Sequence, residues 1–191
     1  MSKVILAMFM SLDGFIEGPN GEFIPPDWSG DLQRYWADDN TDAAGTLLYG
    51  RVNFQFNAGF WQGAAADESN SAEFRAFARK MNSLPKVVFS TTLETAAWEN
   101  TRLVKEHAAE EVARLKQQPG KDIAIFGSSD LATSLLRDGL LDEVRVIVNP
   151  VILGSGKRLF EGIDARVELK LSRTQTFHSG NVLLCYQPVA Q

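Results

Sequence analysis

The sequence predicts an α/β domain whose central sheet is mostly parallel and ends in an antiparallel hairpin. Nearly continuous apolar runs of strand length recur along the chain, as expected of strands that are buried on both faces of a covered sheet. Segments with apolar residues at helical spacing separate these runs, and such alternation is typical of α/β folds. Two further strand-like runs, joined by a short polar turn, close the chain.

Each element has its own signal in the sequence. The strands are expected at residues 4–10, 46–49, 86–89, 123–126 and 144–148, where branched apolar residues dominate. Helices are expected at residues 32–40, 71–81, 106–117 and 131–137. The hairpin strands are expected at residues 168–176 and 181–187, around the turn at residues 178–180. Residues 64–67 are predicted to form a loop inside the domain.

Composition bounds the class of protein. A chain of 191 residues that is 45% hydrophobic and 23% charged fits one domain, here predicted over residues 1–191. Cys185 is the only cysteine and the chain has two histidines, so we expect neither a disulfide nor a metal site. The formal charge is -5 and the basic residues are scattered, which argues against nucleic acid as a partner. The short apolar start is too brief for a signal peptide or a membrane span, so a cytoplasmic protein is expected.

Three loops follow predicted parallel strands, at the sheet edge where such folds bind ligands. The first contains Gly50, Arg51 and Asn53, which combine close backbone approach with a forked phosphate donor. The second is Ser90-Thr91-Thr92, whose hydroxyls either bind a phosphate or cap a turn. The third is Gly127-Ser128-Ser129-Asp130-Leu131, which opens a helix and has either an anion-binding or an ordinary capping role. Together the three loops outline an extended anionic ligand.

Two motifs carry a resemblance to a known family. Residues 140–160 read LLDEVRVIVNPVILGSGKRLF, and residues 11–16 read SLDGFI. With the three loops, these segments resemble the dihydrofolate reductase-like superfamily, specifically the reductase domain at the C-terminus of the bacterial riboflavin-biosynthesis deaminase/reductase. The resemblance extends from Val4 to Tyr186. It implies a three-layer α/β/α fold and hydride transfer from NADPH.

The same resemblance implies where the cofactor lies. Arg51 with Ser90, Thr91 and Thr92 would hold the adenosine phosphate, which favours NADPH over NADH. The segment from Gly127 to Leu131 would cradle the pyrophosphate, and Ile16, Gly50 and Asn53 complete the implied cofactor site. The family often has threonine at the position of Asn53 and glycine at that of Ser128. These two departures predict weakened cofactor binding, since a residue other than glycine restricts the backbone.

The substrate side is implied more loosely. Residues 13–26 resemble a mobile loop that covers the nicotinamide, and Asp13 is a candidate orienting group or loop anchor. Asp31 is either a proton-relay acid or a first-turn helix residue. The substrate residues implied are Met8, Trp36, Gly154, Lys157 and Arg158, the last two either as phosphate ligands or as a solvated turn. Trp28, Tyr35 and Phe56 join Trp36 as aromatic side chains suited to stacking on a heterocycle.

The leading hypothesis is therefore an NADPH-dependent reductase of a small heterocycle, with 5-amino-6-(5-phosphoribosylamino)uracil of riboflavin biosynthesis as the family-implied substrate. The alternatives are a dihydrofolate or pterin reductase and a dimeric nucleotide-binding protein without catalysis. The chain has no zinc deaminase signature, so a lone reductase domain is expected. The apolar C-terminal hairpin favours a homodimer, because unpaired strand edges tend to be covered.

Overall fold

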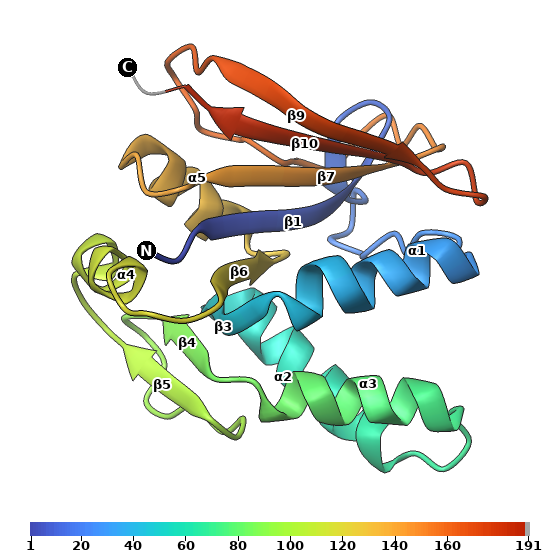
Figure 1. Ribbon diagram of the computed structural model, residues 1–191, viewed down its shortest axis with the longest axis horizontal. Coiled ribbons are helices and arrows are strands. Elements are labelled where there is room, and N and C mark those ends of the chain that lie inside the picture. Colours follow the sequence, from blue (N-terminus) through green and yellow to red (C-terminus); the bar gives the residue numbers. More distant parts are fainter. Residues whose placement is uncertain (190–191) are drawn as a thin grey trace.

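The structure, a computed structural model, describes residues 1–189 and is built on one eight-stranded sheet (Figure 1). Its strand order is β5-β4-β3-β6-β1-β7-β10-β9. The strands are β1 (Val4–Ser11), β3 (Ala44–Gly50), β4 (Lys86–Phe89), β5 (Thr101–Val104), β6 (Asp122–Phe126), β7 (Glu143–Asn149), β9 (Leu169–Thr176) and β10 (Val182–Pro188). The first six strands in the spatial order are parallel, and β10 runs antiparallel to both β7 and β9. The predicted mostly parallel sheet with a C-terminal antiparallel hairpin is confirmed.

Helices cover both faces of the sheet and give the three layers that were predicted. They are α1 (Gly30–Tyr35), the π-helix η1 (Trp36–Asp42), α2 (Arg51–Ala66), α3 (Ala72–Ser83), α4 (Ala108–Lys116) and α5 (Ser129–Arg137). Residues of α1, α2 and α3 pack on one face and residues of α4 and α5 on the other. Among the described residues, no helix is long and apolar enough to cross a membrane.

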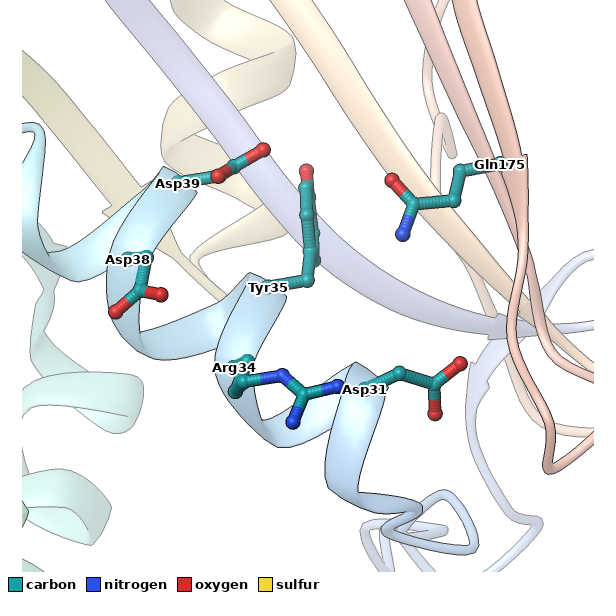
Figure 2. A pocket seen from close by; sticks show the side chains of 6 residues that line it. All are labelled: Asp31, Arg34, Tyr35, Asp38, Asp39 and Gln175. Atoms are coloured by element: carbon teal, nitrogen blue, oxygen red, sulfur yellow. The ribbon is translucent and has the colours of Figure 1, made fainter.

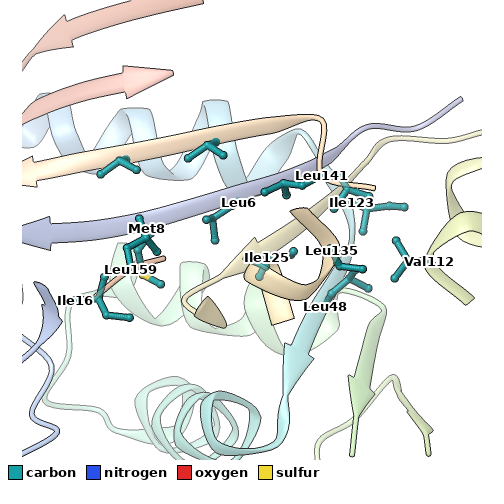
Figure 3. Close-up of a cluster of buried hydrophobic side chains, with 14 of the residues drawn as sticks. Leu6, Met8, Ile16, Leu48, Val112, Ile123, Ile125, Leu135, Leu141 and Leu159 are labelled. Atoms are coloured by element: carbon teal, nitrogen blue, oxygen red, sulfur yellow. The ribbon is translucent and has the colours of Figure 1, made fainter. Parts of the chain in front are cut away.

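The side chains of β1 show why the central strands read as continuous apolar runs. Leu6 and Met8 belong to the cluster on the α4 and α5 side, which also contains Val112 and Leu135 (Figure 3). The alternate residues Ala7 and Phe9 belong to the clusters on the opposite face. A strand that is buried on both sides needs an apolar residue at every position, so β1 has no polar alternation.

Several sequence-based expectations need correction. Residues 64–66, predicted as a loop, form the last turn of α2. The segment 13–26 is not one continuous loop, because β2 (Phe15–Glu17) pairs antiparallel with β8 (Lys157–Arg158) in a second, two-stranded sheet. The helix expected at 32–40 exists, but it begins at Gly30 and continues as a π-helix to Asp42. Strand β5 was not predicted, since Thr101–Val104 contains Thr and Arg and is only partly buried.

Candidate functional site

The three predicted ligand loops lie side by side at the carboxyl edge of the sheet. They follow β4, β3 and β6, which are neighbouring strands. Gly50 at the end of β3 pairs with Phe89 of β4, and Leu48 of β3 pairs with Ile125 of β6. Because strands in a sheet are about 4.8 Å apart, the outer two loops are separated by about 10 Å. The edge therefore offers an extended ligand contacts at three successive points.

A hydrogen bond joins the first and third loops. The backbone N-H of Gly50 donates to Oγ of Ser128 at 3.0 Å. Gly50 is the N-cap of α2 and Ser128 is the N-cap of α5, and the Ser128 hydroxyl does not cap its own helix. Two helix N-termini thus lie next to each other with their first backbone N-H groups free of intrahelical partners. The first turn of α2 has no acidic residue, and Asp130 in the first turn of α5 is paired with Lys157, so the positive ends of both helix dipoles favour an anion here.

Gly127 and Asn53 are in close contact across the same two loops. Gly127 has a φ of +87°, and a Cβ atom there would lie 2.7 Å from Nδ2 of Asn53. Only glycine satisfies both constraints. Asn57 donates from Nδ2 to Oδ1 of Asn53 at 3.1 Å, and Trp61 donates from Nε1 to Oδ1 of Asn57 at 2.9 Å. This ladder along α2 leaves the Asn53 amide N-H groups directed toward the Gly127 loop.

The departure from glycine at Ser128 does not strain the backbone. Ser128 has φ -83° and ψ 78°, within the negative range that any L-residue adopts. Its side chain is 5% exposed and takes up the Gly50 contact. Ser129 is also buried, while Leu131 packs against the hydrophobic core. The weakening that the sequence predicted at this position thus has no basis in backbone conformation.

The predicted phosphate end of the site is open to solvent. Arg51 is exposed and makes one long contact, 3.4 Å from Nη1 to Oε1 of Gln55. Ser90 Oγ accepts hydrogen bonds from the backbone N-H groups of Thr92 (3.2 Å) and Leu93 (3.0 Å), so it caps the turn after β4. Thr91 and Thr92 are exposed. Arg51 is therefore the side chain in this region that is most available to an added anion.

Asp13 anchors the loop after β1. Its carboxylate accepts hydrogen bonds from Ser11 Oγ (2.7 Å) and from the backbone N-H groups of Leu153 (3.1 Å) and Gly154 (2.7 Å). These bonds, that of Ser11 first, lower the pKa of Asp13 to about 2. The side chain is ionised at neutral pH, so of the two roles considered for it the contacts support the loop anchor.

Asp31 likewise joins two segments. Its carboxylate accepts from Ser29 Oγ at 2.5 Å and from the backbone N-H of His178 at 3.0 Å, in the turn between β9 and β10. These contacts, with Ser29 first, lower the pKa of Asp31 to about 2. A carboxylate that is ionised at neutral pH does not donate a proton, so these contacts do not support the proton-relay role.

A cavity of about 240 Å³ adjoins Asp31 between the helix and β9. Figure 2 shows its lining, which comprises Asp31, Arg34, Tyr35, Asp38, Asp39 and Gln175. Asp39 is paired with Arg173 at 2.5 Å. This acidic cavity is suited to a cation or to solvent and lies apart from the loops that favour an anion.

An aromatic cluster lies beside the Gly127 loop and consists of Phe9, Phe23, Trp28, Trp36 and Phe126. Trp36 stacks on Phe9 with ring centroids 4.7 Å apart and lies 5.3 Å from Phe126, the residue before Gly127. Phe9 also contacts Trp28 (5.3 Å) and Phe23 (6.3 Å) edge-on. Trp28 and Phe23 are 40% and 46% exposed, so the cluster opens to solvent on their side.

The sequence predicted this cluster only in part. Trp28 and Trp36 were identified, whereas Tyr35 packs on Phe177 and Phe56 lies exposed on α2. Phe9 and Phe126 were missed, although each lies in or at the end of a strand next to a candidate loop. Met8 and Ile16, implied as ligand contacts, are both buried in the core beside Leu159. Because their side chains are buried, Met8 and Ile16 can support the site by packing against its neighbours.

The basic residues of the Gly154 turn have partners within the protein. Nζ of Lys157 lies 2.8 Å from Oδ1 of Asp130 in the first turn of α5. The guanidinium of Arg158 lies over the ring of Phe15, 4.7 Å from its centroid. The turn itself and Arg158 are exposed to solvent, and the two contacts tie β8 to both β2 and α5.

Comparison with known proteins assigns the chain to a family. Residues 2–183 match the model of the RibD C-terminal domain family. The chain is 36% identical over 184 residues to the uncharacterized protein YyaP of Bacillus subtilis, covering 96% of this chain and 94% of that protein. It is also 33% identical over 90 residues to the uncharacterized YwjB of the same organism, covering 47% of this chain and 52% of that protein.

Solved structures share the fold at low sequence identity. A putative riboflavin biosynthesis protein from Shewanella sp. PV-4 superposes with a TM-score of 0.72 at 17% identity, covering 98% of this chain and 99% of that one. The diaminohydroxyphosphoribosylaminopyrimidine deaminase/5-amino-6-(5-phosphoribosylamino)uracil reductase of Thermotoga maritima gives 0.63 at 17% identity, covering 98% and 57%. Acinetobacter baumannii RibD gives 0.64 at 20% identity, covering 99% and 58%. These chains have the reductase-like fold described above.

Proposed function

The chain belongs to the RibD C-terminal domain family, and on that premise we propose that it is a reductase that uses NADPH to reduce a small heterocycle. The observation that carries the proposal is the Gly50–Ser128 hydrogen bond, which brings two helix N-termini together. Arg51 lies beside them and is free to bind a further phosphate. A dinucleotide with a pyrophosphate and an adenosine phosphate matches this distribution of donors.

Each part of the site has a role in this proposal. The backbone N-H groups at the starts of α2 and α5 and the Asn53 amide bind the pyrophosphate. Arg51 binds the adenosine phosphate and so selects NADPH over NADH. NADPH, when bound, supplies a hydride to the acceptor. The aromatic cluster next to Gly127 orients the acceptor and excludes water.

The second hydrogen of the product arrives as a proton. Asp13 and Asp31 are ionised at neutral pH and held by other segments, so we assign the proton to solvent. The acceptor would then gain one proton from solvent in addition to the hydride supplied by the cofactor. A pterin reductase requires a carboxylate that is available to the substrate, whereas the Asp31 carboxylate is bound by Ser29 and His178. Reduction of dihydrofolate or another pterin is therefore the weaker alternative.

The test is a calorimetric titration of the protein with NADPH and with NADH. We expect NADPH to bind at least about tenfold more tightly, because a charge-assisted phosphate contact contributes about 1.5–3 kcal/mol. Arg51→Ala should remove this preference, while Arg79→Ala, an exposed arginine of α3, should retain it. Absence of binding to either nucleotide would refute the proposal. Tight NADPH binding without turnover on any heterocycle would instead favour the non-catalytic alternative.

We also propose that the protein forms a homodimer through its C-terminal hairpin. Strand β9 is at the edge of the sheet and is exposed along nearly its whole length. Leu169 and Leu171 of β9 and Val189 beyond β10 are large exposed apolar residues. Leu169 and Leu171 are two residues apart on β9 and so share one face of the sheet, and covering them would remove both an apolar patch and a free strand edge.

A further inference from the structure

The aromatic cluster and the charges around it bear on which heterocycle the site accepts. Phe126 links the cluster directly to Gly127, so a ligand stacked on Trp36 lies next to the loop proposed to bind the pyrophosphate. Trp28 and Trp36 meet edge to face at 6.2 Å, and the exposed part of Trp28 leaves one aromatic surface open. Aromatic walls of this kind bind flat rings by stacking.

We infer that the acceptor is a flat heterocycle without a phosphate group, stacked against Trp28 and Trp36. This inference rests on the proposed reductase function and narrows its substrate class. It departs from the phosphoribosyl compound that the family resemblance implies. Three observations carry it: the aromatic cluster itself, the engagement of the nearby basic residues, and the acidity of the helix that carries Trp36.

The two basic residues expected to bind a substrate phosphate each have a partner within the protein, although Arg158 is exposed to solvent. Lys157 pairs with Asp130 at 2.8 Å, and its side chain is only partly exposed. The guanidinium of the exposed Arg158 lies over the buried ring of Phe15. A substrate phosphate at Lys157 would compete with Asp130 for the same ammonium group and would be repelled by the Asp130 carboxylate at the start of α5. The negative charge of Asp130 repels an anion at the N-terminus of α5, and Lys157 neutralises that charge. The Lys157–Asp130 pair therefore favours binding of the cofactor pyrophosphate at this helix end.

The segment that supplies both tryptophans is acidic. Residues 27–42 contain five aspartates and one arginine. Arg173 neutralises Asp39, and Lys80 pairs with Asp42, which leaves three aspartates against Arg34. A phosphate dianion attached to a ring at Trp28 would lie within reach of these carboxylates, because the screening length at physiological salt is about 8 Å. The local charge therefore disfavours a phosphorylated ligand and tolerates a neutral or cationic one.

The experiment compares ligands that differ only in a phosphate. Riboflavin and riboflavin 5′-phosphate, and uridine and its 5′-monophosphate, are titrated calorimetrically into the full chain without nucleotide. We expect at least one of the neutral compounds to bind at least about tenfold more tightly than its phosphorylated partner. Trp28→Ala should weaken that binding about tenfold or more. Phe56→Ala, which truncates an exposed aromatic residue on α2, should leave it unchanged.

The outcomes separate this inference from the proposed function. Equal or tighter binding of the phosphorylated compounds overturns the phosphate-free class, and so does absence of binding by both neutral compounds. Neutral-ligand binding that survives Trp28→Ala overturns the stacking position. NADPH binding is measured on the same variants and should be unaffected by Trp28→Ala. If the wild-type protein does not bind NADPH, the reductase proposal is refuted, but the measured binding of the heterocycles stands.

Discussion

Ser128 Oγ accepts the backbone N-H of Gly50 at 3.0 Å, and this bond joins the loops that begin α2 and α5. Ser128 thereby takes part in positioning both helix ends instead of capping its own helix. The geometry of the proposed anion site thus depends on a side chain at a position where the family often has glycine. The serine side chain occupies space that glycine would leave open, and its hydroxyl holds the Gly50 loop in place.

Removing this hydroxyl tests the role of the bond. Ser128→Ala leaves the Gly50 N-H without its partner, and we expect a loss of about 1 kcal/mol in the free energy of unfolding. NADPH binding should weaken several-fold because the two helix ends are no longer held together. Ser134→Ala, an exposed serine of α5, is the matched control. Thermal unfolding and calorimetry measure both effects, and unchanged values in Ser128→Ala would contradict the positioning role.

Gly127 and Gly50 provide a second test because their environments differ. Gly127→Ala forces an L-residue to a φ of +87° and places Cβ 2.7 Å from Asn53 Nδ2. We expect a cost of about 1–2 kcal/mol from the backbone alone, together with loss of NADPH binding. Gly50 has φ -82° and open space where a Cβ atom would lie, so Gly50→Ala should keep the stability of the wild type. Equal stability of the two variants, measured by denaturant unfolding, would refute this interpretation of Gly127.

The carboxylate of Asp31 predicts a pH dependence of stability. Its pKa is lowered from 3.8 in the free residue to about 2 by Ser29 and His178. A lowered pKa in the folded state means that the unfolded chain binds the proton first as the pH falls. The stabilisation is therefore complete above about pH 4 and is lost toward pH 2.

The Asp31→Asn variant checks this window. Its melting temperature should fall less steeply than that of the wild type between pH 4 and pH 2, while Asp138→Asn, at the exposed end of α5, should follow the wild type. At neutral pH, Asp31→Asn should retain turnover, because the ionised Asp31 donates no proton. A loss of turnover of a hundredfold or more, with the fold intact, would restore Asp31 as a catalytic residue.

The elements that the sequence predicted well are those whose pattern of apolar and polar residues along the chain is distinctive. Strand β1 is apolar from Val4 to Met10 because both its faces are covered, and the loops after β3, β4 and β6 follow from the strand ends. Helix α2 was not recognised over its full length, because its exposed residues Val52, Phe56 and Phe60 remove the usual polar face. Its last turn consists of alanines, which read equally well as a loop.

The parts of the site that could not be predicted depend on tertiary pairing. Arg158 lies over Phe15 only because β8 pairs with β2, and Lys157 reaches Asp130 across the same small sheet. Phe9 and Phe126 meet at Trp36 because the helix crosses the edge between β1 and β6. No spacing in the sequence relates these residues. The sequence therefore located the loops that we propose to bind an anion, but not the side chains that lie beside them.

The exposed C-terminal hairpin carries the last prediction. Leu171 is 50% exposed on the edge strand β9. If two copies meet there, Leu171→Glu places a charge in an apolar contact and should convert a dimer into a monomer. Ile152→Glu is the control, since Ile152 is 71% exposed but follows the end of β7 that adjoins the hairpin turn, whereas Leu171 pairs with Tyr186 near the other end of the hairpin. Analytical ultracentrifugation over a concentration series measures the mass. A wild-type monomer throughout that series would refute the dimer, and a dimer that persists in Leu171→Glu would move the interface elsewhere.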